Sequence, residues 1–569
     1  MDRKVLLAMV LIMAVLFLDQ AISPRFWRPK PKPVPLQQGS GSQPGGSPGG
    51  SQGAGRTGAP GGTAPANPAA GTAAQATPAG DGSRPASPSG AALTRPEVPA
   101  APAEVRDLST EHFQVTITSD GAAIADWVLP GYKDEVRNRP VDLVPQGTRA
   151  YGVIVEAGGR ALDFSQAPFR IVEDHAAQGV LSFEARDASG IRVVRSYRIG
   201  NDRRLLDTEI RVSAPPELGP VRYRLGWGTP LPITEPSTQP NQLQAVALLG
   251  TKLEHVAGSK VAAPERVVSG NVRWVASRSK YFIAAVLPDS GTVSEVAFRN
   301  EGAGLTTAWL LGTASPGAEV TRHARVYAGP IHYETLAAIG AGLDEVANLG
   351  WRWLRGVSVL LLKCLNLLYK VIPNYGVAII VLAAGTKLLF SPLTQSSLRS
   401  MKIMHHLQPQ IKEMQEKYKN DPMKLNQAMM ALYKENKVNP MSGCLPMLLQ
   451  VPVFIGLYNI LLYSIELRAS GFVGYIRDLS APDVLMTVGG FPVHLMPMIM
   501  TASTYVLQSQ TPVAPAQKGM MYVMPLFMLF FMYSFPSGVV LYWTVNNLLS
   551  ALQQYMVNLA EDRRLSAQG

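Results

Sequence analysis

Charged and polar side chains interrupt segments of this chain that are otherwise apolar. In "VLAAGTKLLFSPL", residues 381–393, Lys387 is the one charged residue within a run that could belong to a membrane span. A charge at the centre of a bilayer costs roughly 2.5–3.5 kcal/mol on insertion scales, so such a residue usually has a function or reaches the headgroups. Position alone leaves function and snorkelling to the headgroups equally open for Lys387.

Two further apolar segments carry polar and aromatic residues at four-residue spacing, which places them on one helical face. They are Gln450, Phe454 and Tyr458 in residues 445–463, and Tyr542 with Asn546 and Trp543 with Asn547 in residues 539–556. A Gln or Asn in a span often bonds a neighbouring helix, which is the structural alternative. Because these segments contain no carboxylate, we expect Lys387 to lie in a hydrated cavity rather than in a buried ion pair.

Composition indicates a chain that is part membrane protein and part soluble domain. The 569 residues are 47% hydrophobic and 16% charged, with a net charge of +11. The basic residues are spread widely and no nucleic-acid-binding signature accompanies them, so basic flanks of membrane spans explain the charge better. Residues 104–334 contain no cysteine, which excludes a disulfide framework or a cysteine metal site there.

The first 103 residues divide into an anchor and a linker. Residues 1–28 begin with Arg3 and Lys4 before an apolar run, as in a signal peptide. The one small-x-small cleavage candidate, residues 21–23, is followed by Pro24, so an uncleaved anchor is favoured over a removed signal. Residues 29–103 are rich in Gly, Pro, Ser, Ala and Gln and predict a disordered tether.

Residues 104–334 predict a β domain. Phe113, Val115 and Ile117 alternate along one face, and a turn follows at residues 119–121. Residues 187–190 join a second pair of strand patterns. Many short strands with little helical periodicity indicate an antiparallel sandwich. The histidines are scattered and no catalytic motif is present, so nothing here favours an enzyme.

Two amphipathic segments frame the first predicted span of the C-terminal half. Residues 351–372 carry a polar stripe typical of a helix that lies in the membrane interface, and a span begins near Tyr375. Residues 397–438 predict a lysine-rich helical hairpin, in which Asp421 is the N-cap and Pro422 the first residue of the second helix. The pair His405 and His406 on this hairpin is interpreted as solvated surface rather than a metal site.

Charge asymmetry orients the spans. The hairpin has an excess of lysine, whereas residues 466–483 are balanced to slightly acidic, so the hairpin is predicted to be cytoplasmic and the later loop external. Further spans are predicted near residues 445–463, 491–507, 520–533 and 539–556, and residues 561–569 form a short cytoplasmic tail. With the N-terminal anchor this gives six spans and both termini in the cytoplasm.

Long stretches of the C-terminal half resemble a known family. "KVNPMSGCLPMLLQVPVF" and "FPSGVVLYWTVNNLLSALQQ" are similar to core and closing segments of the YidC membrane protein insertases, and the resemblance covers residues 351–564. Residues 104–334 resemble the large periplasmic domain of Gram-negative members through order, length and "SKYFIAAVLP". The resemblance implies a polytopic α-helical membrane bundle of six spans with an insertase core at 373–560, plus an all-β periplasmic supersandwich domain similar to sugar mutarotases.

The resemblance also implies a hydrophilic groove that is open to the cytoplasm and to lipid. Members of the family usually carry arginine five residues before the Pro of "PLT", and counting back from Pro392 gives Lys387. Lysine keeps the charge but lacks the planar fork of arginine. The residues implied are Lys387 as groove charge, Gln450, Asn546 and Thr544 as groove lining, and Phe454, Tyr458, Tyr542 and Trp543 as contacts for a substrate helix.

The function implied is insertion of nascent membrane proteins into the bacterial inner membrane without nucleotide, metal or other cofactor. The partners implied are nascent membrane proteins, the Sec translocon with its accessory subunits, the phospholipid bilayer and, weakly, the translating ribosome. A solute transporter or lipid flippase is the first alternative and predicts inverted repeats or intramembrane acid–base pairs. A membrane-anchored sugar-binding protein is the second and requires a histidine and a carboxylate that converge in an open cleft.

Overall fold

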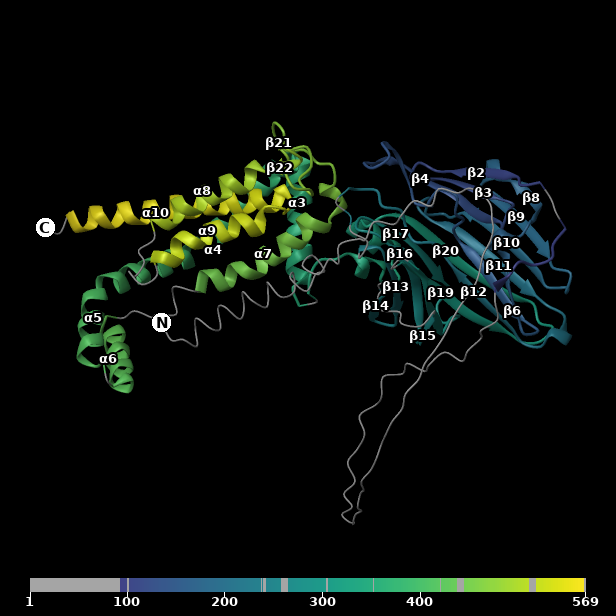
Figure 1. Cartoon of the computed structure of the whole chain (residues 1–569), viewed down its shortest axis with the longest axis horizontal. Helices are drawn as coiled ribbons and strands as arrows, with labels where there is room; N and C mark the ends of the chain where they lie inside the picture. The colour runs from purple at the N-terminus through teal and green to yellow at the C-terminus, as the bar shows by residue number, and fades with distance from the viewer. Residues whose placement is uncertain are drawn as a thin grey trace, which may run out of the picture. The chain divides into compact units, whose positions relative to one another are not determined.

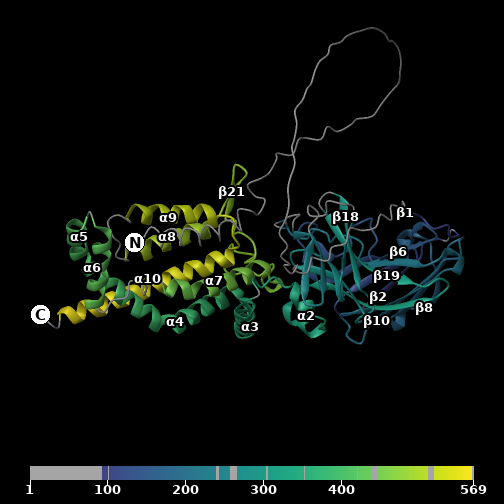
Figure 2. The same cartoon turned by 90° about the horizontal axis from the view of Figure 1, so that it is seen from below.

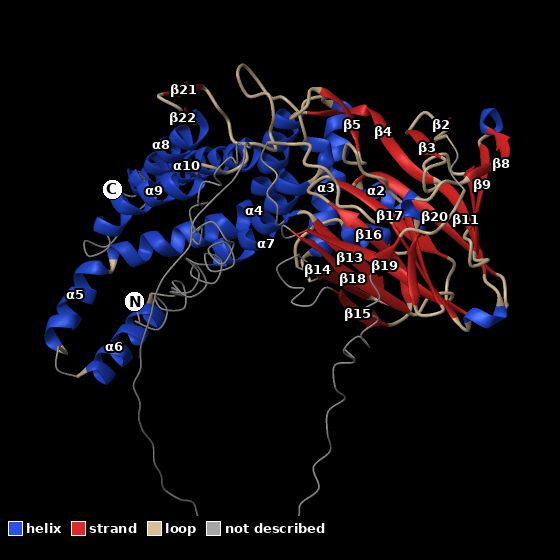
Figure 3. Cartoon of the chain, turned by 45° about the vertical axis from the view of Figure 1, so that its right-hand side comes forward, coloured by secondary structure: helices blue, strands red, loops and turns tan. Residues whose placement is uncertain are grey.

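The computed structural model describes residues 93–566, apart from residues 100–101, 237, 239–241, 257–264, 303–304, 352, 420, 437–444 and 511–517. The predicted anchor, residues 1–28, and most of the predicted linker, residues 29–103, lie outside the described residues. Strands make up the first part of the described chain, and helices make up most of the second (Figure 3). The two parts are named the β domain, residues 93–330, and the helical region, residues 375–566.

Three sheets make up the β domain, and most of their strands are labelled in Figure 1. In spatial order the seven-stranded sheet consists of β1 (Leu93–Thr94), β7 (Arg160–Asp163), β6 (Gly152–Ala157), β12 (Val221–Gly226), β19 (Leu305–Ala314), β18 (Glu295–Gly302) and β15 (Glu265–Ser269). The nine-stranded sheet consists of β14 (Lys252–Val256), β13 (Gln244–Leu249), β16 (Val272–Arg278), β17 (Phe282–Pro288), β20 (Val320–Pro330), β11 (Leu206–Ser213), β10 (Arg192–Ile199), β9 (Val180–Arg186) and β8 (Arg170–His175). The four-stranded sheet consists of β2 (Val105–Ser109), β3 (Gln114–Thr118), β4 (Ala123–Asp134) and β5 (Arg139–Asp142).

A single apolar core joins the large sheets, because inward-facing residues of both belong to one cluster of buried side chains. Phe113, Val115 and Ile117 alternate into this core as the sequence predicts, and each is at most 1% exposed. The turn between β3 and β4 requires glycine at position 121, where φ is +83° and a Cβ would lie 2.1 Å from the Ser165 carbonyl oxygen. The predicted β-rich architecture is confirmed.

The N-terminal edge of the β domain corrects the predicted end of the linker. Leu93 and Thr94 form β1, which pairs with β7 in parallel, and Val98 packs against the core. These residues fall inside the segment 29–103 that composition assigns to a tether. A two-residue strand among Ala, Pro and Thr has no periodicity that would reveal it, and only the exposed edge of β7 makes the pairing possible.

Short helices follow the last strand and cover one face of the nine-stranded sheet. Helix α2 (Tyr333–Ile339) and the 3₁₀ turn η6 (Leu343–Val346) contribute Leu336 and Leu343 to a cluster that also includes Trp274 of β16. Helix α3 (Arg355–Val371) begins four residues later than the predicted amphipathic helix 351–372. Its exposed side contains both lysines and the apolar residues Leu360 and Leu367. Arg355, the first residue of the helix, forms an ion pair with Asp344.

Five longer helices run alongside one another in the helical region (Figures 1 and 2). They are α4 (Tyr375–His406), α7 (Leu445–Tyr463), α8 (Leu495–Ser509), α9 (Lys518–Met532) and α10 (Ser537–Ser566). Contacts join α4 to α10 and α7, and α8 to α9 and α10. By length and hydropathy alone, the described residues contain one helix sufficient to cross a membrane, at Tyr375–Leu398 in α4.

The polar hairpin is shorter than predicted. Residues 397–406 continue α4, and the hairpin consists of α5 (Gln408–Lys417) and α6 (Pro422–Glu435), which lie side by side in Figures 1 and 2. Pro409 explains the break, because proline has no N–H for the helical ladder and its ring clashes with the carbonyl four residues earlier. Asp421 caps α6 as predicted, since its side chain accepts a hydrogen bond from the Lys424 N–H at 3.1 Å.

The segment before α8 is also different from the prediction. Residues 491–493 belong to a small hairpin of β21 (Met486–Val488) and β22 (Phe491–Val493) rather than to a span beginning at 491. Gly489 and Gly490, with φ of 57° and 82°, make its turn. The Asp483 carboxylate then accepts the N–H groups of Leu495 and Met496 at 2.8 and 2.9 Å, which fixes the start of α8.

The last helix runs past the predicted end of its span. Helix α10 continues to Ser566, through most of the predicted tail 561–569, because no proline or glycine interrupts residues 539–566.

Candidate functional site

Three helices bring hydrogen-bonding side chains together at Tyr542. Gln450 Nε2 of α7 donates to the Tyr542 hydroxyl of α10 at 2.6 Å. Thr386 of α4 and Asn546 of α10 also face this hydroxyl. The four-residue spacing of Tyr542 and Asn546 places both on the side of α10 that faces the other two helices. The structure therefore brings together Gln450 of α7 with Tyr542 and Asn546 of α10. The sequence predicts all three as site residues on two separate segments.

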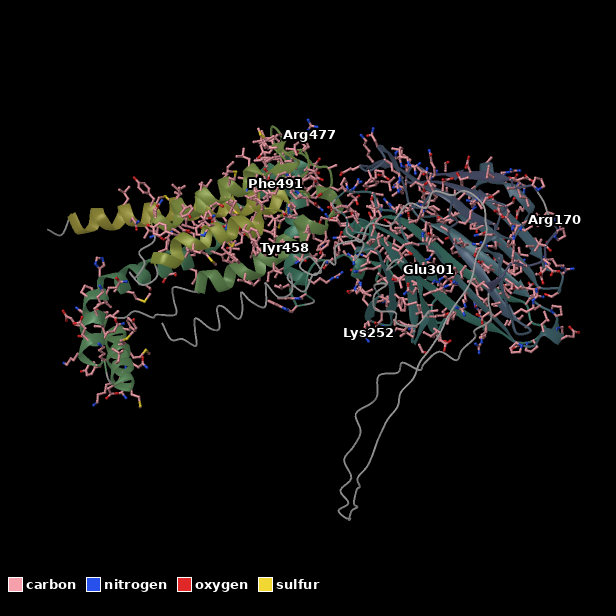
Figure 4. All side chains as sticks on the ribbon, viewed as in Figure 1. Arg170, Lys252, Glu301, Tyr458, Arg477 and Phe491 are labelled. Atoms are coloured by element: carbon pink, nitrogen blue, oxygen red, sulfur yellow. The ribbon has the colours of Figure 1, made fainter. Side chains whose placement is uncertain are left out.

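An aromatic row lies beside this polar cluster. The Phe454 ring of α7 meets the edge of Trp543 of α10 at 4.8 Å between centroids. Tyr458, labelled in Figure 4, continues the row one turn further along α7, with its ring 6.4 Å from Phe454 and 5.7 Å from Phe535. Large rings with one polar end suit a surface that is apolar on one side and hydrated on the other. Three of the predicted substrate contacts, Phe454, Tyr458 and Trp543, thus form one aromatic row, whereas Tyr542 is buried.

Lys387 lies next to Thr386 on α4 and is half-buried. Ser391, one turn further on the same face, has its Oγ 3.3 Å from Gln553 Nε2 of α10, so this face of α4 is directed toward α10. Among the described residues no carboxylate lies within ion-pair distance of the Lys387 ammonium. The charge is therefore not neutralised by the described helices around it.

Asn546 carries a second unsatisfied polar group. Its Oδ1 atom is buried and has no hydrogen-bond partner among the described residues. Asn547 is different, because its amide donates to Ser503 and Thr504 of α8 at 3.1 and 2.8 Å and so joins two helices. A buried acceptor without a partner costs about 1–3 kcal/mol unless water or a bound molecule supplies the hydrogen bond.

The structure does not bring Thr544 into the cluster. Its hydroxyl donates to the Val540 carbonyl of its own helix at 2.8 Å, and its side chain is buried. Two positions after Tyr542, Thr544 points to nearly the opposite side of α10, because consecutive helical residues are separated by about 100°. These contacts give no support to the predicted lining role of Thr544, and its hydroxyl has the self-satisfied geometry common in helices.

Sequence reasoning missed two contacts of the site. Thr386 reaches the Tyr542 hydroxyl, and Gln553 reaches Ser391. Gln553 lies eleven residues after Tyr542, which returns to the same face of a helix after three turns, so the spacing could have predicted its side. Nothing in the spacing of α4 alone distinguishes Thr386 from any other helical threonine.

Comparisons with known proteins cover nearly the whole described chain. Residues 106–356 match the family model of the YidC periplasmic domain, and residues 367–564 match the model of the 60Kd inner membrane protein family. The membrane protein insertase YidC of Syntrophus aciditrophicus is 32% identical over 98% of this chain and 99% of that protein. The YidC insertase of Pelobacter propionicus is 33% identical over 81% of this chain and 88% of that protein.

Solved structures of YidC proteins are also similar. A crystal structure of an active YidC insertase with its first transmembrane domain resolved covers 81% of this chain and 94% of that chain, at 17% identity and a TM-score of 0.34. YidC from Thermotoga maritima covers 81% of this chain and 99% of that chain, at 14% identity and a TM-score of 0.26. Identity along nearly the full length of a curated relative, with both family models in the expected order, shows that this chain belongs to the YidC family of membrane protein insertases.

Proposed function

We propose that α4, α7 and α10 line a hydrophilic groove through which this insertase moves the polar tail of a nascent membrane protein. The observation that carries the proposal is the half-buried Lys387, which has no carboxylate within ion-pair distance among the described residues. Beside it lie the polar cluster at Tyr542 and the unpaired Asn546 oxygen. Uncompensated polar groups at membrane depth mark a path that holds water or a passing ligand.

In this mechanism the groove charge draws in the extracellular tail of a substrate, which is often short and acidic. Water and the Gln450–Tyr542 pair lower the cost of taking polar groups partway through the bilayer. The hydrophobic span then moves along Phe454, Tyr458 and Trp543 into lipid, and the burial of its apolar surface drives the step. No covalent chemistry and no nucleotide are involved.

The proposed topology has six spans and both termini in the cytoplasm. Helices α4, α7, α8, α9 and α10 supply five, and residues 1–28 supply the N-terminal anchor. The lysine-rich hairpin α5–α6 is then cytoplasmic and receives the chain first, since basic loops stay on the inner side. We propose that the protein acts alone and with the Sec translocon and its accessory subunits, and that its contact with the translating ribosome is weak.

Insertion in proteoliposomes tests the role of the charge. Substrates are a small phage-coat-like protein with an acidic tail and its matched version with a neutral tail. Lys387→Ala is expected to reduce insertion of the acidic substrate at least tenfold and that of the neutral substrate much less, because the charge acts on the tail. Lys387→Arg should retain activity. Lys363→Ala, which removes an exposed lysine of α3, is the control; equal activity of Lys387→Ala and Lys363→Ala would contradict the proposal.

The receiving role of the hairpin has its own test. Replacement of residues 408–435 by a short Gly-Ser linker should slow capture of substrate while leaving the groove intact. Unchanged insertion by this variant would remove the hairpin from the mechanism but would not affect the groove.

A further inference from the structure

A cavity of about 500 Å³ lies against the edge of the nine-stranded sheet, and its lining includes none of the residues assigned to the groove. Strands β13, β14 and β16 form one side, and η6 with the segment that leads into α3 forms the other, with Tyr463 at the end of α7. Lys252 of β14, labelled in Figure 4, lies on its wall. A cavity of this size falls within the range of small-molecule sites.

Arg278, the last residue of β16, lines the cavity and is only 8% exposed. Its backbone is fixed between Gln244 of β13 and Ile283 of β17. No hydrogen bond or ion pair joins its guanidinium to another residue in the described part of the chain. Burial lowers the pKa of Arg278, and no carboxylate contributes to its electrostatic surroundings. Arginine remains charged in proteins even so, and the cavity therefore contains a cation whose donors are unused.

A second buried cation stands two residues later. Lys280 also lines the cavity, is 5% exposed, and lies 4.6 Å from the centre of the Tyr281 ring. A tight turn fixes it, because the Ser279 N–H donates to the Phe282 carbonyl at 2.8 Å. Burial lowers the pKa of Lys280.

Carboxylates compensate the charge of Lys280 without direct contact. Glu135, Glu235 and Asp478 each favour its charged form, and none forms an ion pair with it among the described residues. Glu235 is instead paired with Arg468 at 2.7 Å.

The other cations of the cavity are already compensated. Arg355 pairs with Asp344 at 2.9 Å and with Glu345 at 3.4 Å, and Lys252 pairs with Glu254 at 2.7 Å. The excess positive charge of the cavity therefore comes from Arg278. A buried cation without a counter-ion is costly, and an anion that enters the cavity would remove that cost.

We propose that this cavity binds a small polyol phosphate, with its phosphate group on Arg278. A guanidinium fork suits a tetrahedral oxyanion, because the fork can donate two parallel hydrogen bonds. The cavity has room beyond a bare phosphate, and amide side chains of Gln242, Gln244 and Asn348 line the rest of it, as binding of hydroxyl groups requires. This chemistry is shared by soluble glycerol phosphate and by the headgroup of phosphatidylglycerol.

Two binding measurements on the full chain test the site and distinguish its two sources of ligand. In the first, the delipidated protein in an uncharged maltoside detergent is titrated with glycerol phosphate by calorimetry. In the second, native mass spectrometry compares retention of phosphatidylglycerol with that of phosphatidylcholine. Saturable binding in the first assigns a soluble ligand, and selective retention in the second alone assigns a lipid headgroup.

Matched variants connect the binding to Arg278. Arg278→Gln should weaken binding by about tenfold to a hundredfold, the usual effect of removing a hydrogen-bonded charge, and Arg278→Lys should weaken it less. Arg170→Gln is the control, because Arg170 is an exposed arginine of β8 that is not among the lining residues of the cavity. Figure 4 labels Arg170 and the cavity residue Lys252. No binding in either measurement, or equal binding by Arg278→Gln and Arg170→Gln, would overturn the proposal.

Stability without ligand gives an independent readout. Arg278→Gln is expected to leave the melting temperature of the ligand-free protein unchanged or to raise it, because the variant removes a buried cation that lacks a counter-ion. A structural arginine would behave in the opposite way. A lower melting temperature of the ligand-free variant would therefore count against a ligand site at Arg278.

Discussion

The β domain and the helical region both bury cationic side chains, but their surroundings differ. Arg195 in the β domain is 1% exposed, and its guanidinium donates to the carbonyl oxygens of Gly121 and Tyr151. The rings of Tyr151 and Tyr197 lie 4.9 and 5.5 Å from it. Lys387 in the helical region is half-buried without a carboxylate within ion-pair distance among the described residues.

This difference separates a structural cation from a functional one. A buried charge whose donors are all used stabilises the fold that uses them and has nothing left to offer a ligand. A buried charge whose donors are unused costs free energy in the empty protein, and it persists where a ligand or substrate supplies the missing partner. By this criterion Arg195 is structural, whereas we propose that Lys387 and Arg278 are functional.

The largest expected effect is a loss of stability when the structural cation, Arg195, is replaced. Arg195→Met should destabilise the β domain by about 2–5 kcal/mol, because two buried carbonyl oxygens lose their hydrogen bonds. Urea unfolding followed by tryptophan fluorescence measures the change. Arg170→Met, at an arginine whose side chain is 78% exposed, should change stability by less than about 0.5 kcal/mol. Equal effects of the two variants would refute the structural role of Arg195.

The second prediction concerns Lys387 and the insertion of substrate. Lys387→Met should reduce insertion of an acidic-tailed substrate at least tenfold, which corresponds to about 1.4 kcal/mol, without lowering the stability of the helical region. Thermal unfolding in detergent and insertion in liposomes are measured on the same preparation. A clear loss of stability in Lys387→Met would mean that the lysine has a structural partner, as Arg195 does.

The third prediction measures a polar contact in the bundle. A double-mutant cycle with Gln450→Leu and Tyr542→Phe should give a coupling energy of about 0.6 kcal/mol, the average for hydrogen bonds between membrane helices. The same cycle on insertion rates tests whether the pair also acts on substrate. A coupling energy near zero would show that the 2.6 Å contact does not hold α7 to α10.

The smallest effects concern two carboxylates whose pKa values shift in opposite directions. The hydrogen bond from Arg192 lowers the pKa of Glu184 in the β domain, whereas burial raises the pKa of Glu466 in the loop after α7. The stability that Glu184 contributes is therefore present above its unfolded pKa, about 4.3, and is lost as the pH falls through its lower folded pKa. The cost of ionising Glu466 appears instead as the pH rises above about 4.3 and is complete above its higher folded pKa.

Unfolding free energies at pH 3, 5 and 7 check both signs. Glu184→Gln should destabilise by about 0.5 kcal/mol at pH 7 and by less at pH 3. Glu466→Gln should stabilise at pH 7, with a gain that shrinks as the pH falls. A His332→Gln background controls for the imidazole, because His332 Nε2 lies 3.5 Å from Glu466 Oε1. Parallel pH profiles of Glu184→Gln and Glu466→Gln would contradict the assigned directions.

The fold could be predicted where the pattern is periodic and local. Alternation at Phe113, Val115 and Ile117 predicts a strand and its buried face, and Asp421 with Pro422 predicts a helix start. Prediction failed where one residue or one partner decides the outcome. Pro409 divides the expected hairpin helix, and β1 exists only because the edge of β7 is available to it.

The candidate site divides in the same way. The spacing of Gln450, Phe454 and Tyr458 determines which side of α7 they share, and the register from Pro392 singles out Lys387. Spacing does not show which helices face each other, so it gave no reason to include Thr386. The two-residue spacing of Tyr542 and Thr544, in contrast, already indicates opposite sides of one helix.

The sequence by itself determined the family, the β-rich domain followed by apolar helices, and the presence of a charge within an apolar helix. These features depend on residue type and on periods of two or about 3.6, which any stretch of chain carries locally. Only the tertiary structure decided which buried polar groups have partners. Arg195 and Arg278 are both strand residues whose side chains are buried, and their sequence contexts do not distinguish them. Packing brings carbonyl oxygens to the first and an open cavity to the second.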